Sequence, residues 1–67
     1  MNILLNGHLK QFNIDHMTVA TLVQELELTG KRIAIECNGN IVPRSQFELV
    51  KLVEGDKLEI VGAVGGG

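Results

Sequence analysis

The stretch TVATLVQELELTG, residues 18–30, repeats apolar side chains with a helical period. They recur at i, i+3, i+4 and i+7, the spacing that gathers side chains on one side of an α-helix. These residues are Val19, Leu22, Val23 and Leu26. Thr18 is suited to the N-cap, and Gly30 to the position just after the C-terminus. We therefore predict one amphipathic helix of about ten residues, long enough to cover one face of a small sheet.

The residues before this helix alternate apolar and polar side chains, as strands do. In NILLN, Ile3 and Leu5 share one face, and Leu4 faces the other way. An Asn-Gly turn follows, and LKQFNI continues the alternation up to Ile14. Residues 2–14 are therefore predicted to form a β-hairpin.

Two further segments with strand alternation follow the helix. In RIAIECN, Ile33, Ile35 and Cys37 share one face, and the Asn-Gly turn after them predicts a second hairpin. KLEIVGAV, residues 57–64, is predicted to be the last strand, with Leu58 facing the helix.

The segment between these strands contains a stop signal and a cap signal. Pro43 ends a short edge strand, because proline cannot donate a hydrogen bond to a ladder. Ser45 and Glu48 fit a capping box for one helical or 3₁₀ turn. The predicted order ββαβ(β)β favours an α+β sheet with a single covering helix. The domain is expected to span residues 1–64, followed by a flexible glycine tail at 65–67.

Composition indicates a small globular protein outside the nucleic-acid and membrane classes. The 67 residues include 45% apolar and 21% charged side chains, and the formal net charge is −2. The six basic residues are scattered, so no basic face for a nucleic acid is visible. No segment has the pattern of a signal peptide or of a membrane span. A single cysteine allows no internal disulfide, so we expect a cytoplasmic location.

Side-chain catalysis has little support in this sequence. His8, His16 and Cys37 are far apart and lack metal-ligand spacing, so no metal site is predicted. Cys37 is in phase with the apolar face of its strand, which indicates a small buried hydrophobe rather than a reactive thiol. No phosphate-binding glycine loop and no nucleophile triad are visible. Three acids are expected to form a solvated face: Glu54, Asp56 and Glu59.

The last five residues, AVGGG at 63–67, make the terminal carboxylate the candidate reactive group. A carboxylate becomes a good electrophile once it is joined to AMP, and for this it must reach the ATP site of another protein. Glycines suit a narrow channel because they carry no side chains. Five extended residues reach roughly 16 Å. The alternative is that the glycines are only a frayed end.

Two segments resemble a known family: NGNIVPR at 38–44 and VEGDKLEIVGAVGGG at 53–67. With the chain length and the terminal Gly-Gly pair, they are similar to the ThiS family, ubiquitin-like β-grasp proteins that carry sulfur in thiamine biosynthesis. The resemblance covers essentially the whole chain. It implies a mixed sheet of four to five strands covered on one face by a single α-helix.

The resemblance also implies partners and a modified atom. A ThiF-type adenylating enzyme would use ATP and magnesium to convert the Gly67 carboxylate into an acyl-adenylate. A persulfide from a cysteine desulfurase pathway would displace AMP and leave a thiocarboxylate, from which the thiazole synthase ThiG would take the sulfur. Gly65 and Gly66 would thread into the partner sites. The chain itself would be a protein co-substrate, a monomer that binds no cofactor.

A glycine tail offers every partner the same backbone groups, so the folded domain must present a docking surface beside it. Leu4 in the first strand, and Val61 and Ala63 in the last, are predicted to face away from the helix. Leu4 and Val61 are expected to form an exposed apolar patch near the tail. Two alternatives remain open: a MoaD-type carrier of molybdopterin synthesis, and a ubiquitin-like binding module whose glycines are inert.

Overall fold

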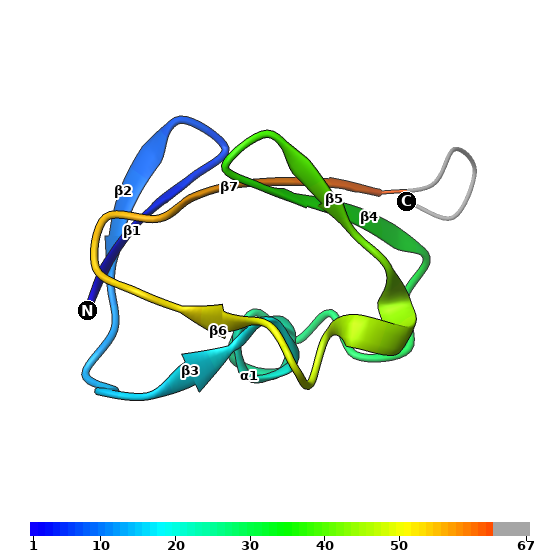
Figure 1. The fold of residues 1–67 in the computed structure, drawn as a ribbon, viewed down its shortest axis with the longest axis horizontal. Helices are drawn as coiled ribbons and strands as arrows, with labels where there is room; N and C mark the ends of the chain where they lie inside the picture. The colour runs from blue at the N-terminus through cyan, green and yellow to red at the C-terminus, as the bar shows by residue number, and fades with distance from the viewer. Residues whose placement is uncertain (63–67) are drawn as a thin grey trace.

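The computed structural model describes residues 1–62, which form a sheet, a helix beneath it and a second, smaller sheet (Figure 1). The predicted boundary between a domain at 1–64 and a tail at 65–67 lies outside the described residues. The elements, in chain order, are β1 (Asn2–Leu5), β2 (His8–Gln11), β3 (Met17–Thr18), α1 (Val19–Glu25), β4 (Ile33–Cys37), β5 (Asn40–Val42), the 3₁₀ helix η1 (Arg44–Gln46), β6 (Lys51–Leu52) and β7 (Lys57–Gly62).

The large sheet has the strand order β2-β1-β7-β4-β5. β1 and β7 pair in parallel, whereas β1–β2, β4–β5 and β4–β7 are antiparallel pairs. The last strand of the described chain is therefore the central strand of the sheet. This confirms the predicted α+β class, with a mixed five-stranded sheet and one α-helix. The first and last strands are neighbours in it.

The core lies between the large sheet and α1. Leu22 of α1 and Leu58 of β7 are fully buried, as the predicted phases of helix and strand require. No aromatic side chain belongs to the fully buried set of the described residues, so the core is aliphatic, as composition indicates. Its members are Ile3, Leu5, Met17, Val19, Leu22, Val23, Ile35, Val42, Leu52 and Leu58.

The helix is shorter than predicted. α1 ends at Glu25, and Glu27 has φ of 58°, in the left-handed region that turns a chain out of a helix. The N–H of Glu27 donates to the carbonyl oxygen of Gln24 at 3.0 Å, which satisfies a free carbonyl of the last turn. Gly30 was predicted to come directly after the helix, and this is wrong, because the helix ends earlier. Gly30 lies in the turn that follows, where it adopts φ of 79°.

A second sheet, which the sequence did not reveal, joins β3 to β6. It pairs Met17 with Leu52 and Thr18 with Lys51, and Met17 and Leu52 are both buried. Two-residue strands are too short to show alternation. Thr18 also caps α1 as predicted, since its Oγ1 accepts a hydrogen bond from the N–H of Thr21 at 3.2 Å.

Two other predicted boundaries need correction. β2 ends at Gln11, so the first hairpin is shorter than the predicted range up to Ile14, whose side chain still packs against the core. The 3₁₀ turn was predicted correctly, but its N-cap is Pro43 and no side chain caps it. The proposed capping box of Ser45 and Glu48 is therefore wrong.

Candidate functional site

The candidate site is the end of β7, where the described chain stops. β7 is held on one edge by β4, with Gly62 opposite Ile33. On the other edge the side-chain amide of Asn6 continues the ladder: its Oδ1 accepts from the N–H of Ile60 at 2.7 Å, and its Nδ2 donates to the Ile60 carbonyl at 3.1 Å. The strand is thus anchored on both edges close to its end. Sequence reasoning identified Asn6 only as a turn residue.

Most of the predicted site residues lie beyond this point. Ala63, Gly65, Gly66 and Gly67 are outside the described residues, so their roles stay predictions. What the structure describes is the surface around Gly62, from which the remaining five residues of the chain continue.

Val61 lies on the face of the sheet away from α1, opposite Ala34, and it is 63% exposed. Leu4 faces the same way but is paired with Lys57, four residues before Val61 in the parallel register. At ~3.3 Å per residue this offset separates Leu4 from Val61 by about 13 Å along the strand. The prediction that Leu4 and Val61 form one patch is therefore wrong, whereas docking at Val61 stays a prediction.

On the helix side, an open groove of about 390 Å³ borders the end of β7. Its floor is apolar, and Lys31 and Arg32 stand at its edge. No local signal in the sequence shows that these two cations lie beside Gly62, which comes 30 residues after Arg32 in the chain. The groove brings together residues from β1, the turn after it, the loop that follows α1, β4 and β7.

The three acids near the C-terminus do not form one solvated face. Asp56 is only 9% exposed, and its carboxylate accepts hydrogen bonds from the N–H of Val53 at 2.8 Å and from Nδ2 of Asn38 at 3.0 Å. It joins the turn before β7 to the turn between β4 and β5. Glu59 does lie on the open face of the sheet, directly opposite Glu36 of β4. The prediction is therefore wrong for Asp56, which is a structural residue.

Cys37 is half-buried on the core side of β4. Burial raises the pKa of its thiol, and the nearby Asp56 carboxylate raises it further. Because the thiolate is the reactive form of cysteine, both effects lower its reactivity near neutral pH. This agrees with the prediction of a packing residue rather than a chemical one.

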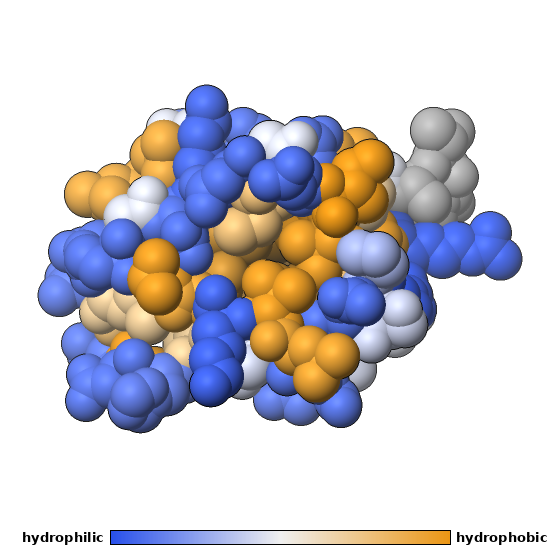
Figure 2. Space-filling view, in the orientation of Figure 1, coloured by the Kyte–Doolittle hydropathy of each residue, from blue (hydrophilic) through white to orange (hydrophobic). Residues whose placement is uncertain are grey.

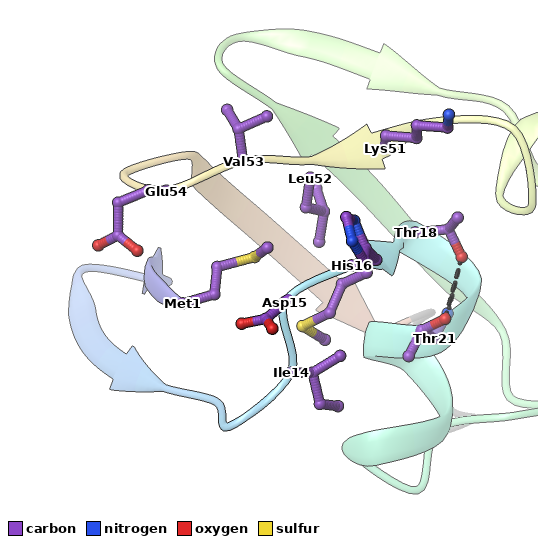
Figure 3. Close-up of a pocket in the computed structure, with 11 residues that line it drawn as sticks. Met1, Ile14, Asp15, His16, Thr18, Thr21, Lys51, Leu52, Val53 and Glu54 are labelled. Atoms are coloured by element: carbon purple, nitrogen blue, oxygen red, sulfur yellow. Dashed lines mark hydrogen bonds between the residues drawn. The ribbon is translucent and has the colours of Figure 1, made fainter.

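A larger pocket of about 590 Å³ lies beside Met1, between the N-terminal strand and the β3–β6 sheet (Figure 3). Asp15 and His16 line it, but they point to different sides in Figure 3, and the only side-chain hydrogen bonds drawn there belong to the helix cap. Residues 1–62 contain no group of three or more metal-binding side chains near one another. None of the helices in this part of the chain is long and apolar enough to span a membrane.

Known proteins resemble this chain over its full length. The ThiS family model matches residues 3–67. The sulfur carrier protein ThiS of Bacillus subtilis is 33% identical over 63 residues, which cover 94% of this chain and 96% of that protein. A protein of Paramagnetospirillum magneticum named thiazole synthase is 42% identical over all 67 residues, although the chain spans only 20% of its length.

A solved structure has the same fold. The crystal structure of the thiamine biosynthesis protein ThiS from Geobacter metallireducens matches with a TM-score of 0.86 and 26% identity, covering 100% of both chains. This match confirms the predicted ubiquitin-like β-grasp fold. Because the family model and the Bacillus subtilis relative both span nearly the whole sequence, the chain belongs to the ThiS family.

Proposed function

We propose that this protein is the sulfur carrier of thiamine biosynthesis and that its working group is the carboxylate of Gly67. The observation that carries the proposal is the family match, which runs through residue 67, together with the relative named sulfur carrier protein ThiS. The carboxylate oxygen attacks the α-phosphate of ATP, and pyrophosphate leaves. The outer sulfur of a donor persulfide then attacks the carbonyl carbon, and AMP leaves, which gives an acyl disulfide. A thiol cleaves the S–S bond, forms a disulfide with the donor cysteine and leaves a thiocarboxylate on Gly67.

The described domain supports a carrier role rather than catalysis by its own side chains. β7 is the central strand, and both its edges are hydrogen-bonded close to Gly62. The remaining five residues therefore start from a fixed point, and they reach roughly 16 Å when extended. Glycines fit a narrow catalytic channel, because no side chain has to enter with the backbone. Gly65 and Gly66 are the residues that we assign to this threading.

The proposed partners follow from the chemistry. A ThiF-type adenylating enzyme supplies the ATP and magnesium site, and a cysteine desulfurase supplies the persulfide sulfur. A thiazole synthase accepts the sulfur, a proposal supported by the thiazole synthase of Paramagnetospirillum magneticum, part of whose sequence matches this whole chain. The cytoplasmic location and the monomeric state stay predictions.

Intact-protein mass spectrometry tests the proposed function. Incubation with the adenylating enzyme, ATP, magnesium, a persulfide donor and a reducing thiol is expected to exchange one oxygen for one sulfur. Deleting Gly67, or adding one residue after it, should abolish adenylation and leave the fold intact. Normal modification of the lengthened chain at its new end would contradict the role of Gly67. A wild-type chain that never gains sulfur would instead indicate an inert binding module.

Docking at Val61 is a separate test. Its side chain is 63% exposed beside the end of β7, so an aspartate there keeps the fold but places a charge on an apolar contact. We expect Val61→Asp to weaken binding to the adenylating enzyme and to thiazole synthase at least tenfold, about 1.4 kcal/mol, in calorimetric titration. Leu9→Asp is the matched control, since Leu9 is 73% exposed but lies on the edge strand β2. Unchanged affinity of the Val61 variant would place the docking surface elsewhere.

A further inference from the structure

The groove on the helix side of β7, named here the exit groove, has an apolar floor that no residue in 1–62 fills. The floor is made by Leu26, Leu28, Ile33 and Ile60. All four pack against the core but remain only partly buried, so they keep apolar surface in contact with water. Gly62 also lines the groove, and the groove lies on the opposite side of the sheet from Val61. Apolar surface gathered in an open groove is typical of a binding site.

The edge of the exit groove is positively charged. Lys31 and Arg32 are both exposed and both line it, and no described residue of its lining is acidic. Arg44 lies close by, since its Nη2 donates to the carbonyl oxygen of Lys31 at 3.0 Å. Three of the six basic residues of a chain with net charge −2 thus lie around one loop. Figure 2 shows hydrophilic side chains at the end of the molecule where β7 stops.

The length of the chain beyond Gly62 limits where a partner can sit. Five residues continue after Gly62, and they reach roughly 16 Å when fully extended. An enzyme that acts on the carboxylate of Gly67 must therefore bring the mouth of its active site close to the end of β7. The exit groove begins at Gly62 and so lies within that radius, which puts it within reach of a partner that binds the tail.

We propose that the exit groove is a docking site for the enzyme that activates the carboxylate of Gly67. This inference rests on the proposed function. The partner places an apolar side chain on the groove floor and an aspartate or glutamate against Lys31 and Arg32. The apolar contact removes the floor from water, and the opposite charges set the orientation and speed the encounter. Together with Val61 on the other face, the groove lets the enzyme contact both sides of β7.

Charge reversal in the full-length chain tests this proposal. The double variant Lys31→Glu/Arg32→Glu is expected to bind the adenylating enzyme at least about tenfold more weakly in calorimetric titration at low salt. High salt should reduce the difference, because screening weakens interactions between exposed charges. The matched control is Lys10→Glu/Lys51→Glu, which changes the net charge equally but lies on β2 and β6. We expect this control to bind within about twofold of the wild type.

A second variant tests the floor. Leu28→Asn keeps the length and branching of the side chain but makes it polar, and thermal unfolding verifies that the variant is folded. We expect its affinity for the enzyme to fall at all salt concentrations, because the lost contact is apolar. An affinity equal to that of the wild type would overturn the assignment of the floor.

Several outcomes overturn the inference and leave the proposed function standing. Equal weakening of both charge-reversed doubles would show that only net charge matters. Tighter binding by the Lys31/Arg32 variant would indicate that the groove holds the chain's own terminal carboxylate. A changed oligomeric mass with unchanged enzyme affinity would indicate a second copy of this chain in the groove. In each case the wild type still gains sulfur at Gly67, whereas a wild type that gains none would refute the proposed function itself.

Discussion

Asp56 provides the sharpest test of how this small domain is held together. Its carboxylate accepts from the N–H of Val53 at 2.8 Å and from Nδ2 of Asn38 at 3.0 Å. Its carbonyl oxygen accepts from the N–H of Leu4 at 2.9 Å. One residue therefore connects the turn before β7 with the β4–β5 turn and with β1. We predict that Asp56→Ala is among the most destabilising single substitutions of a polar residue in the described chain.

The magnitude follows from the two side-chain hydrogen bonds. A hydrogen bond to a charged group contributes about 1.5–3 kcal/mol, so two give an upper range of about 3–6 kcal/mol. Asn38 is exposed, so in the variant water can take the place of the Asp56 carboxylate as its hydrogen-bond partner. The Asn38–Asp56 hydrogen bond therefore contributes less to stability than the upper figure. We therefore expect a loss of about 2–3 kcal/mol. A chain of 67 residues has a free energy of unfolding of roughly 3–10 kcal/mol, so the loss is a large part of the total.

Urea unfolding followed by circular dichroism measures this loss, and thermal unfolding should show a midpoint lowered by about 10–20 °C. Asp56→Asn should lose about half as much, because its oxygen can still accept from Val53 while its amide faces that of Asn38. Glu48→Ala, which removes an exposed acid, is the control and should change stability by less than about 0.5 kcal/mol. A loss below about 1 kcal/mol for Asp56→Ala would refute the conclusion that Asp56 holds the two turns and β1 together.

Three further predictions concern the other acids and the cysteine. Cys37→Ser should keep sulfur transfer, because burial raises the pKa of the Cys37 thiol and keeps it in the unreactive, protonated form. The substitution should cost some stability, since Cys37 packs against the core. A folded variant that cannot be thiolated would show that the thiol is essential. The backbone N–H of Asn2 donates to the Glu54 carboxylate at 2.9 Å, and this hydrogen bond lowers the pKa of that carboxyl. The hydrogen bond should therefore stabilise the fold above the ordinary glutamate pKa, and this stabilisation should be lost as pH falls through the lowered pKa of Glu54. Urea midpoints of Glu54→Gln and wild type should therefore differ near neutral pH and converge in acid, and a constant difference would contradict this assignment. Glu36 and Glu59 lie opposite each other on neighbouring strands, and their like charges repel. Glu36→Gln removes this repulsion and should raise the free energy of unfolding by a few tenths of a kcal/mol at low salt, and added salt should abolish the difference from the wild type.

Local patterns in the sequence predicted the elements that depend on near neighbours. The period of Val19, Leu22 and Val23 predicted α1 and its buried side, because the helical repeat alone brings these side chains together. The Asn-Gly pair at 38–39 predicted a turn, because both residues adopt positive φ, here 52° and 86°. The resemblance of the C-terminal segments predicted the family and the mixed sheet with one covering helix, whereas the parallel pairing of β1 with β7 is seen only in the structure.

Contacts between residues far apart in the chain stayed hidden from sequence reasoning. Asn6 continues the β1–β7 ladder only because Ile60, 54 residues later, lies beside it. Asp56 had the appearance of a solvated turn acid, and its burial depends on Asn38, 18 residues earlier. The β3–β6 sheet likewise exists because Met17 and Leu52 are buried together.

The same distinction applies to the candidate site. The identity of the reactive terminus is an expectation from the residues themselves, because a side-chain-free end is a local property of AVGGG. The register that separates Leu4 from Val61, and the groove that brings Lys31 and Arg32 beside Gly62, depend on how five strands and one helix pack. Side-chain period and turn dihedrals are set within a few residues, whereas register and grooves result from burying one common core, to which the whole chain contributes at once.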